Sequence, residues 1–169
     1  SAARRAEEYL KYTKIGDTAF FGPELEFFVF DDVRFDTSMM SAFYHLDSLE
    51  SPTNSGTFYD AGNMGHRPAV KGGYFPVPPV DSAADMRCEM IQILADMGMK
   101  PYVSHHEVAP AQHEMGITFS TLAASADNVQ KYKYAVHMVA ASYGKTATFM
   151  PKPIYGDNGS GMHTHQSIW

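Results

Sequence analysis

Two carboxylates interrupt an apolar segment near the start of the chain. Glu24 and Glu26 stand two residues apart among aromatic and β-branched residues that predict a β-strand. Side chains alternate along a strand, so both carboxylates should leave the same face, roughly 7 Å apart at the backbone. A solvated sheet edge is one interpretation of this pair. The segment is so apolar that burial on both faces is the other, and buried carboxylates need cations or hydrogen-bond donors.

A second acidic pair flanks a predicted hairpin turn. A turn centred between Pro110 and Ala111 places Glu107 directly opposite Glu114. Like charges that face each other destabilise a sheet, whereas a divalent cation between them reverses that effect. Carboxylate oxygens suit the hard ions Mg²⁺ and Mn²⁺. The two histidines before Glu107 could suggest a zinc hydrolase, but the H-E-x-x-H pattern is absent and Pro110 forbids a helix here.

A glycine-rich stretch near the end of the chain, DNGSGMHTHQS, is the third chemical feature. Its glycines permit close approach of the backbone to an anion, and His163, His165 and Ser167 would line one face of the strand that follows. A metal site, an anion site and a simple turn all remain open for this stretch, since a lone histidine is more often structural. The three features form a two-metal, oxygen-rich site only if one sheet brings their strands together.

The elements that must position these side chains mix helices and strands without a regular βαβ rhythm. Helices are predicted where apolar residues recur at helical spacing, and strands where aromatic and β-branched residues cluster. The expected elements are a helix over 2–14, a strand over 19–31, loops and short strands over 32–73, an ordered loop over 71–81, a helix over 82–99 with Asp81 or Ser82 as N-cap and its methionines in the core, hairpin strands over 102–108 and 113–120, and a helix over 127–143 with Ser125 as N-cap. This order favours an α+β fold with a largely antiparallel sheet.

Composition narrows the class of protein further. The chain has 169 residues, 44% of them hydrophobic, and a formal net charge of −6, so nucleic acid is a poor first expectation as a partner. A single cysteine, Cys88, cannot form an internal disulfide, and we find neither a signal peptide nor a membrane-spanning run. We therefore expect a cytoplasmic protein. Both ends fall inside predicted elements, which indicates a piece of a longer protein.

Four motifs in order, FFGPELEFFVFDD, NMGHRPAVKGGYFPVPPVDSA, HHEVAPAQHE and NGSGMHTHQSIW, closely resemble the catalytic region of bacterial type I glutamine synthetase. The likeness covers about residues 15–169. It implies a glutamine synthetase/guanido kinase-like catalytic domain, with a curved, largely antiparallel sheet and flanking helices. Residues 1–169 would be the N-terminal portion of that domain, without the family's β-grasp domain and C-terminal part.

The resemblance implies an ATP-dependent ligase that joins ammonia to glutamate through a γ-glutamyl phosphate, giving glutamine, ADP and phosphate. Glu24 and His163 would hold one divalent metal, Mg²⁺ or Mn²⁺, near the phosphates of ATP. A second metal, near glutamate, would be held by Glu26, Glu107 and Glu114. The remaining residues implied by the resemblance are Asn158 and Gly159 for glutamate, Phe119, His165, Gln166 and Ser167 for ATP, Tyr74 near the ammonium site, and Glu107 with Tyr74 as the catalytic pair.

The resemblance also has departures and alternatives. Tyr102 stands where the family commonly has a glutamate that touches the nucleotide, and Ser104 replaces a histidine. The segment alone should be inactive, because the family's phosphate-binding arginines are missing from it. Ring-shaped homo-oligomers, dodecamers in this family, are implied by resemblance alone. A γ-glutamyl-polyamine or amide ligase and a non-catalytic structural relative are the alternatives.

Overall fold

One long strand, β1 (Ala19–Phe30), organises the fold because both of its edges are paired. This computed structural model describes residues 1–51 and 65–169. The elements are α1 (Ala2–Thr13), β1 (Ala19–Phe30), β2 (Asp32–Thr37), β3 (Ala42–Asp47), α2 (Ala84–Asp96), β4 (Pro101–His106), β5 (Gln112–Ile117), β6 (Ser120–Thr121), α3 (Leu122–Ser142), β7 (Thr146–Thr148) and β8 (Met162–Ile168).

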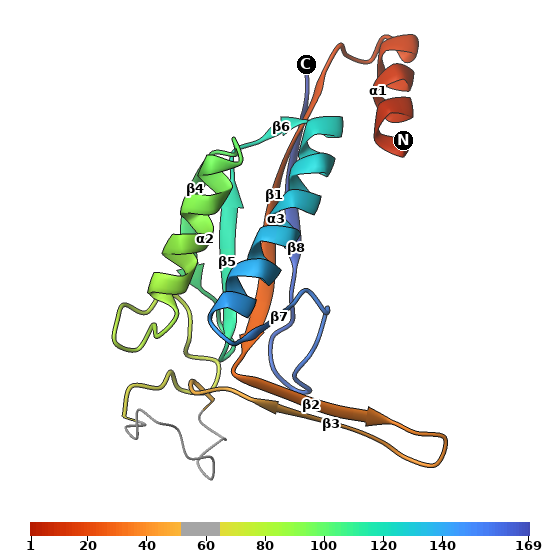
Figure 1. Cartoon of the computed structure of the whole chain (residues 1–169). Coiled ribbons are helices and arrows are strands. Elements are labelled where there is room, and N and C mark those ends of the chain that lie inside the picture. Colours follow the sequence, from red (N-terminus) through yellow and green to blue (C-terminus); the bar gives the residue numbers. More distant parts are fainter. Residues whose placement is uncertain (52–64) are drawn as a thin grey trace.

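The main sheet is antiparallel at every pairing that the described residues make. Its order is β4-β5-β1-β6, and β7 and β8 pair with β1 as well. The hairpin of β2 and β3 forms a separate two-stranded sheet that extends away from the rest (Figure 1). The predicted α+β class with a largely antiparallel sheet is therefore confirmed.

The larger hydrophobic cluster lies on the face of the sheet that α2 and α3 cover (Figure 1), and a smaller cluster around Phe28 and Phe30 lies at the hairpin end of β1. Leu25, Phe27 and Val29 of β1 point into the larger cluster and pack with residues of both helices, such as Met90 and Val136. Since side chains alternate along a strand, Glu24 and Glu26 must leave the opposite face. We call that opposite side of the sheet the open face.

The helices follow the predicted periodicity, but their starts differ from prediction. The helix expected from residue 82 starts at Ala84, with Ala83 as N-cap and no side-chain cap. The predicted caps have other partners: Asp81 binds Arg87 at 2.5 Å, and the Ser82 hydroxyl donates to the Glu50 carboxylate at 2.7 Å. A charged or buried partner outweighs the modest stabilisation that a cap provides.

The second long helix, α3, starts five residues earlier than predicted. Ser125 is buried inside the helix rather than capping it. The preceding strand β6 pairs with β1 and continues directly into the helix, and the Glu7 carboxylate of α1 accepts the Ala123 N–H at 3.0 Å. A group distant in sequence thus satisfies a helix N-terminus that local rules would have capped.

The other predicted elements agree more closely with the structure. The helix over 2–14 and the strand over 19–31 are confirmed, and residues 71–81 form the expected irregular loop. The loops and short strands expected over 32–73 include β2 and β3, and residues 52–64 lie outside the described residues. Among the methionines of α2 and its end, Met86 and Met90 are buried as predicted, whereas Met97 is 38% exposed and that prediction was wrong. No helix in the described part of the chain is long and apolar enough to cross a membrane.

Candidate metal centre and active site

The open face gathers acidic side chains from neighbouring strands. Glu26 of β1 lies directly opposite Glu114 of β5 in the antiparallel register. Glu24 lies opposite Gly116 on that side and opposite His163 of β8 on the other. The single sheet therefore brings together the three features that the sequence presents separately.

The predicted hairpin register was wrong by two residues. His105, rather than Glu107, pairs with Glu114. The turn is centred as predicted, because Gln112 N–H donates to the Ala109 carbonyl at 3.2 Å. Beyond the turn, the first hydrogen bond between the two strands runs from Glu107 N–H to the Gln112 carbonyl, at 2.8 Å. The extra residues therefore lie on the β4 side of the turn. A shift of two residues keeps every side chain on its face, so Glu107 still belongs to the open face.

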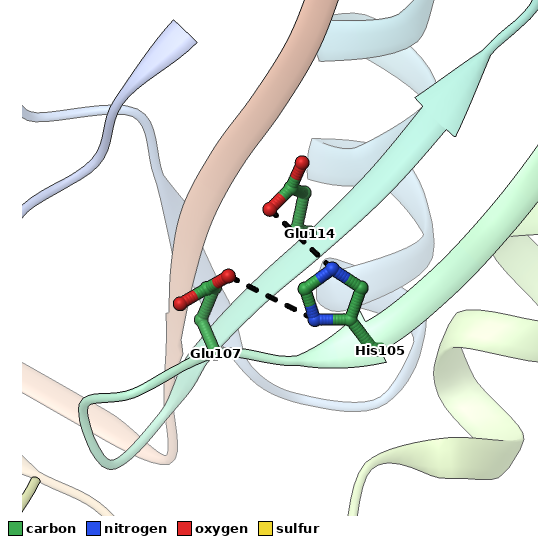
Figure 2. Close-up of side chains that lie close together, drawn as sticks. All are labelled: His105, Glu107 and Glu114. Carbon is green, nitrogen blue, oxygen red and sulfur yellow. Dashed lines mark ion pairs between the residues drawn. The ribbon is translucent and has the colours of Figure 1, made fainter. Parts of the chain in front are cut away.

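His105, Glu107 and Glu114 form a compact cluster in which one possible ligand atom from each residue lies within 4.8 Å of the others. The imidazole lies between the two carboxylates, with Nδ1 at 3.8 Å from Glu107 Oε1 and Nε2 at 3.4 Å from Glu114 Oε2 (Figure 2). All three side chains are at most 12% exposed. Two carboxylates and an imidazole make a donor set that suits Mn²⁺, and the carboxylates also suit Mg²⁺.

The electrostatics of this cluster fit a cation. Burial raises the pKa of Glu107, and its contacts with Glu114 and the charge of Glu26 raise it further, although a hydrogen bond from Val108 N–H opposes the shift. Hydrogen bonding to His105 lowers the pKa of Glu114. Burial disfavours the charged form of His105, yet its bond to Glu114 raises the pKa of the imidazole overall. The carboxylates thus need positive charge, which a divalent ion would supply.

A second group surrounds Glu24. The Tyr102 hydroxyl donates to Glu24 Oε1 at 2.9 Å, and His165 Nε2 lies 3.2 Å from the same oxygen. A β-bulge between Pro101 and Val103 turns Tyr102 toward Glu24, with its ring over Gly116. His163 of β8 lies directly opposite Glu24 in the antiparallel register.

The glycine loop lies beside these carboxylates. Gln112 Nε2 donates both to Glu26 Oε2 at 2.7 Å and to the Gly159 carbonyl at 2.9 Å. Lys71 Nζ donates to Asn158 Oδ1 at 3.1 Å. The Tyr74 ring lies edge-on to His105, with 5.5 Å between ring centroids. The predicted glutamate loop and Tyr74 therefore both border the acidic cluster.

The residues expected to contact ATP line one cavity of about 400 Å³. Its lining residues are Phe20, Phe119, His165, Gln166, Ser167 and Trp169. Phe20 and Phe119 meet edge to face, with ring centroids 5.5 Å apart. Since β8 carries both His163 and this lining, the cavity adjoins the Glu24 end of the acidic row.

The family described as glutamine synthetase, catalytic domain, matches residues 1–169. The chain belongs to this glutamine synthetase family. It is 62% identical over 167 residues to the glutamine synthetase of Rhizobium meliloti (strain 1021), an alignment that covers 99% of the chain. The chain spans 36% of the length of that relative.

Solved structures agree with this family assignment. The cryo-EM structure of Plasmodium falciparum glutamine synthetase superposes with a TM-score of 0.92 at 30% identity, covering 99% of the chain and 33% of that protein. A structure of the GmaS/ADP complex gives a TM-score of 0.71 at 26% identity, with 99% and 33% covered. The glutamine synthetase fold expected from the motifs is thereby confirmed.

The sequence suggested His105 only as part of a zinc site and did not indicate Gln112 at all. His105 is two residues before Glu107, and Gln112 is two residues before Glu114. Strand alternation puts residues two apart on one face, so this spacing could have identified both. Glu50 contacts the site from behind. Its spacing could not have identified it, because it follows a stretch of sequence without helical or strand periodicity.

Proposed function

We propose that the chain supplies part of the active site of an ATP-dependent glutamine synthetase. The full-length protein would join ammonia to the γ-carboxylate of glutamate through a γ-glutamyl phosphate, releasing ADP and phosphate. The supporting observation is the buried cluster of His105, Glu107 and Glu114 on the open face, with Glu26 opposite Glu114. Facing carboxylates destabilise a fold unless a cation joins them, so their presence supports metal-dependent chemistry.

Two divalent ions, Mg²⁺ or Mn²⁺, would be held by different parts of the acidic row. Glu26, Glu107 and Glu114 would hold one ion near glutamate, with His105 beside it. Glu24 and His163 would hold the other near the phosphates. When bound, such ions neutralise the transferring phosphoryl group and orient the accepting carboxylate.

The remaining residues would bind and orient the substrates. Asn158 and Gly159 would receive glutamate, and their loop is joined to Lys71 and Gln112 by hydrogen bonds. Tyr74 would border the ammonium, because an aromatic face and nearby carboxylates favour a cation before it is deprotonated. Together with Glu107, Tyr74 would therefore be the side chain nearest the reacting amine.

The ATP site would adjoin the Glu24 end of the row. Phe119, His165, Gln166 and Ser167 would contact the nucleotide along the 400 Å³ cavity. The aromatic pair that it contains offers a ring face for stacking. At the position where the family commonly has a glutamate, Tyr102 would place a neutral hydroxyl donor next to the phosphates.

Residues 1–169 would be the N-terminal portion of the catalytic domain, acting inside the full-length protein. The family resemblance supports a cytoplasmic, ring-shaped homo-oligomer of the dodecamer type. Sedimentation of the full-length protein tests the assembly.

The test of function uses the full-length protein with glutamate, ATP, ammonium and Mg²⁺. We expect glutamine and phosphate in equal amounts, and a loss of at least about 100-fold in rate for Glu114→Gln, which removes one metal carboxylate. Glu89→Gln is the matched control, because Glu89 is an exposed residue of α2 on the other side of the sheet.

Each alternative has its own outcome in the same assay. Turnover with a polyamine or alkylamine and none with ammonium would assign an amide ligase of another specificity. Mn²⁺ binding without any turnover would indicate a non-catalytic relative. Either result would refute the glutamine synthetase proposal.

A further inference from the structure

The carboxylate of Glu50, which follows β3, lies buried behind the acidic cluster and accepts three hydrogen bonds. Ser82 Oγ donates to Oε1 at 2.7 Å, and the Ala111 N–H donates to Oε2 at 2.8 Å. His106 Nε2 lies 2.6 Å from Oε2. Glu50 is only 5% exposed, so few of these contacts can be replaced by water. One side chain thereby joins the start of α2, the end of β4 and the hairpin turn.

His106 extends this connection to a fourth segment. Its Nδ1 lies 2.8 Å from the Gly73 carbonyl and 2.6 Å from the Glu107 carbonyl. Carbonyls only accept, so Nδ1 must carry a proton, and a second proton on Nε2 would complete an ion pair with Glu50. Burial alone would raise the pKa of Glu50, but the hydrogen bond and charge of His106 lower it to about 2.

These contacts fix the backbone on both sides of the predicted ammonium site. Gly73 N–H donates to the Val108 carbonyl at 3.1 Å, which holds the loop carrying Tyr74 against the hairpin. The fit is tight, because a Cβ on Gly73 would lie 2.5 Å from the Glu107 carbonyl oxygen. The His106 imidazole therefore reinforces the backbone bonds that set the relative position of Tyr74 and Glu107.

We propose that Glu50 is a positioning residue for this site. Through His106 and Ala111 it holds in one geometry the turn that carries Glu107 and the loop that carries Tyr74. The proposal rests on the proposed function only for the roles of those two residues. A positioning role differs from a role in stability alone. Loss of the Glu50 carboxylate should alter metal binding and ammonium use by more than the loss of stability explains.

The test compares Glu50→Gln with wild type in the full-length protein. An amide offers one acceptor oxygen where the carboxylate offers two, so its NH₂ faces either the Ala111 N–H, which cannot accept, or the Ser82 hydroxyl, which can turn to accept; the negative charge beside His106 is lost in both orientations. We expect Mn²⁺ affinity, measured by titration without substrates, to fall about 10- to 100-fold. The KM for ammonium should also rise severalfold. Glu50→Asp keeps the charge and should restore part of both.

Met90→Ala is the control for a loss of stability, because Met90 is fully buried in the apolar cluster on the helix-covered face. Ser82→Ala deletes one donor to Glu50 and serves if Glu50→Gln fails to fold; it should weaken Mn²⁺ binding severalfold. Mn²⁺ affinity that matches the Met90→Ala control would overturn the proposal. Glutamine formation by wild type is scored separately, so its absence would reject the proposed function without deciding the role of Glu50.

Discussion

Gly161→Ala adds one methyl group at the point where the glycine loop meets a predicted metal ligand. A Cβ on Gly161 would lie 2.8 Å from Glu26 Oε1 and 3.4 Å from its Cδ. The backbone itself would tolerate alanine, since Gly161 is not among the residues with positive φ. The perturbation therefore falls on the Glu26 carboxylate and on little else.

The size of the effect follows from that distance. To reach ordinary contact the Glu26 oxygen must retreat by about 0.6 Å. Metal–oxygen distances tolerate a displacement of only about 0.2 Å, so the ligand would leave the coordination sphere or distort it. We expect Mn²⁺ affinity to fall about 10- to 100-fold. The melting temperature should change little, because the end of a flexible side chain moves rather than the core.

Isothermal titration of the full-length protein with Mn²⁺ measures this effect without relying on turnover. Gly22→Ala is the matched control: it adds the same methyl group on β1, where the nearest heavy atom is 3.4 Å away. Unchanged Mn²⁺ affinity in Gly161→Ala would refute the assignment of Glu26 as a ligand. An equal loss in both variants would show that the effect does not arise at Glu26.

Three further substitutions test separate parts of the site. Tyr102→Phe removes the hydroxyl that donates to Glu24 and should weaken the nucleotide-side metal between about two- and tenfold; a metal titration that shows no change counts against that contact. Lys71→Met removes the cation bound to Asn158 and should raise the KM for glutamate up to about fivefold with kcat retained, because the pair is exposed; an unchanged KM would reject this role. Tyr132→Phe removes the buried hydroxyl shared by two strand carbonyls and should lower the melting temperature by about 2–4 °C, while a change in Mn²⁺ affinity would contradict its purely structural role.

The sequence predicted the parts of the fold that depend on local pattern. The alternation of β1 placed Glu24 and Glu26 on one face, and apolar spacing located the ends of α2 and α3 to within five residues. Helix starts were less predictable, since the groups that decide them come from elsewhere in the chain. Asp81 and Ser82 are good capping residues by type, and only the folded chain shows that Arg87 and Glu50 engage them.

The candidate site shows the same division. The predicted hairpin alone placed Glu107 and Glu114 on one face. Their direct cross-strand pairing was wrong, because no local sequence pattern indicates how many residues the turn region contains. His105 could have been identified from its spacing to Glu107. Glu50 could not, since its role depends on bonds to His106 and Ala111, which lie more than fifty residues away in the chain.

The alternation of β1 makes this strand intolerant of odd changes in length. Leu25 and Phe27 occupy the core, while Glu24 and Glu26 between them supply the open face. Inserting one residue before Glu24 would exchange the two sets, burying carboxylates among the helices and exposing aromatic rings where metal should bind. Inserting two residues would preserve the faces and shift only the register. In libraries that vary the length of β1, folded variants should therefore be those whose length changes by an even number of residues.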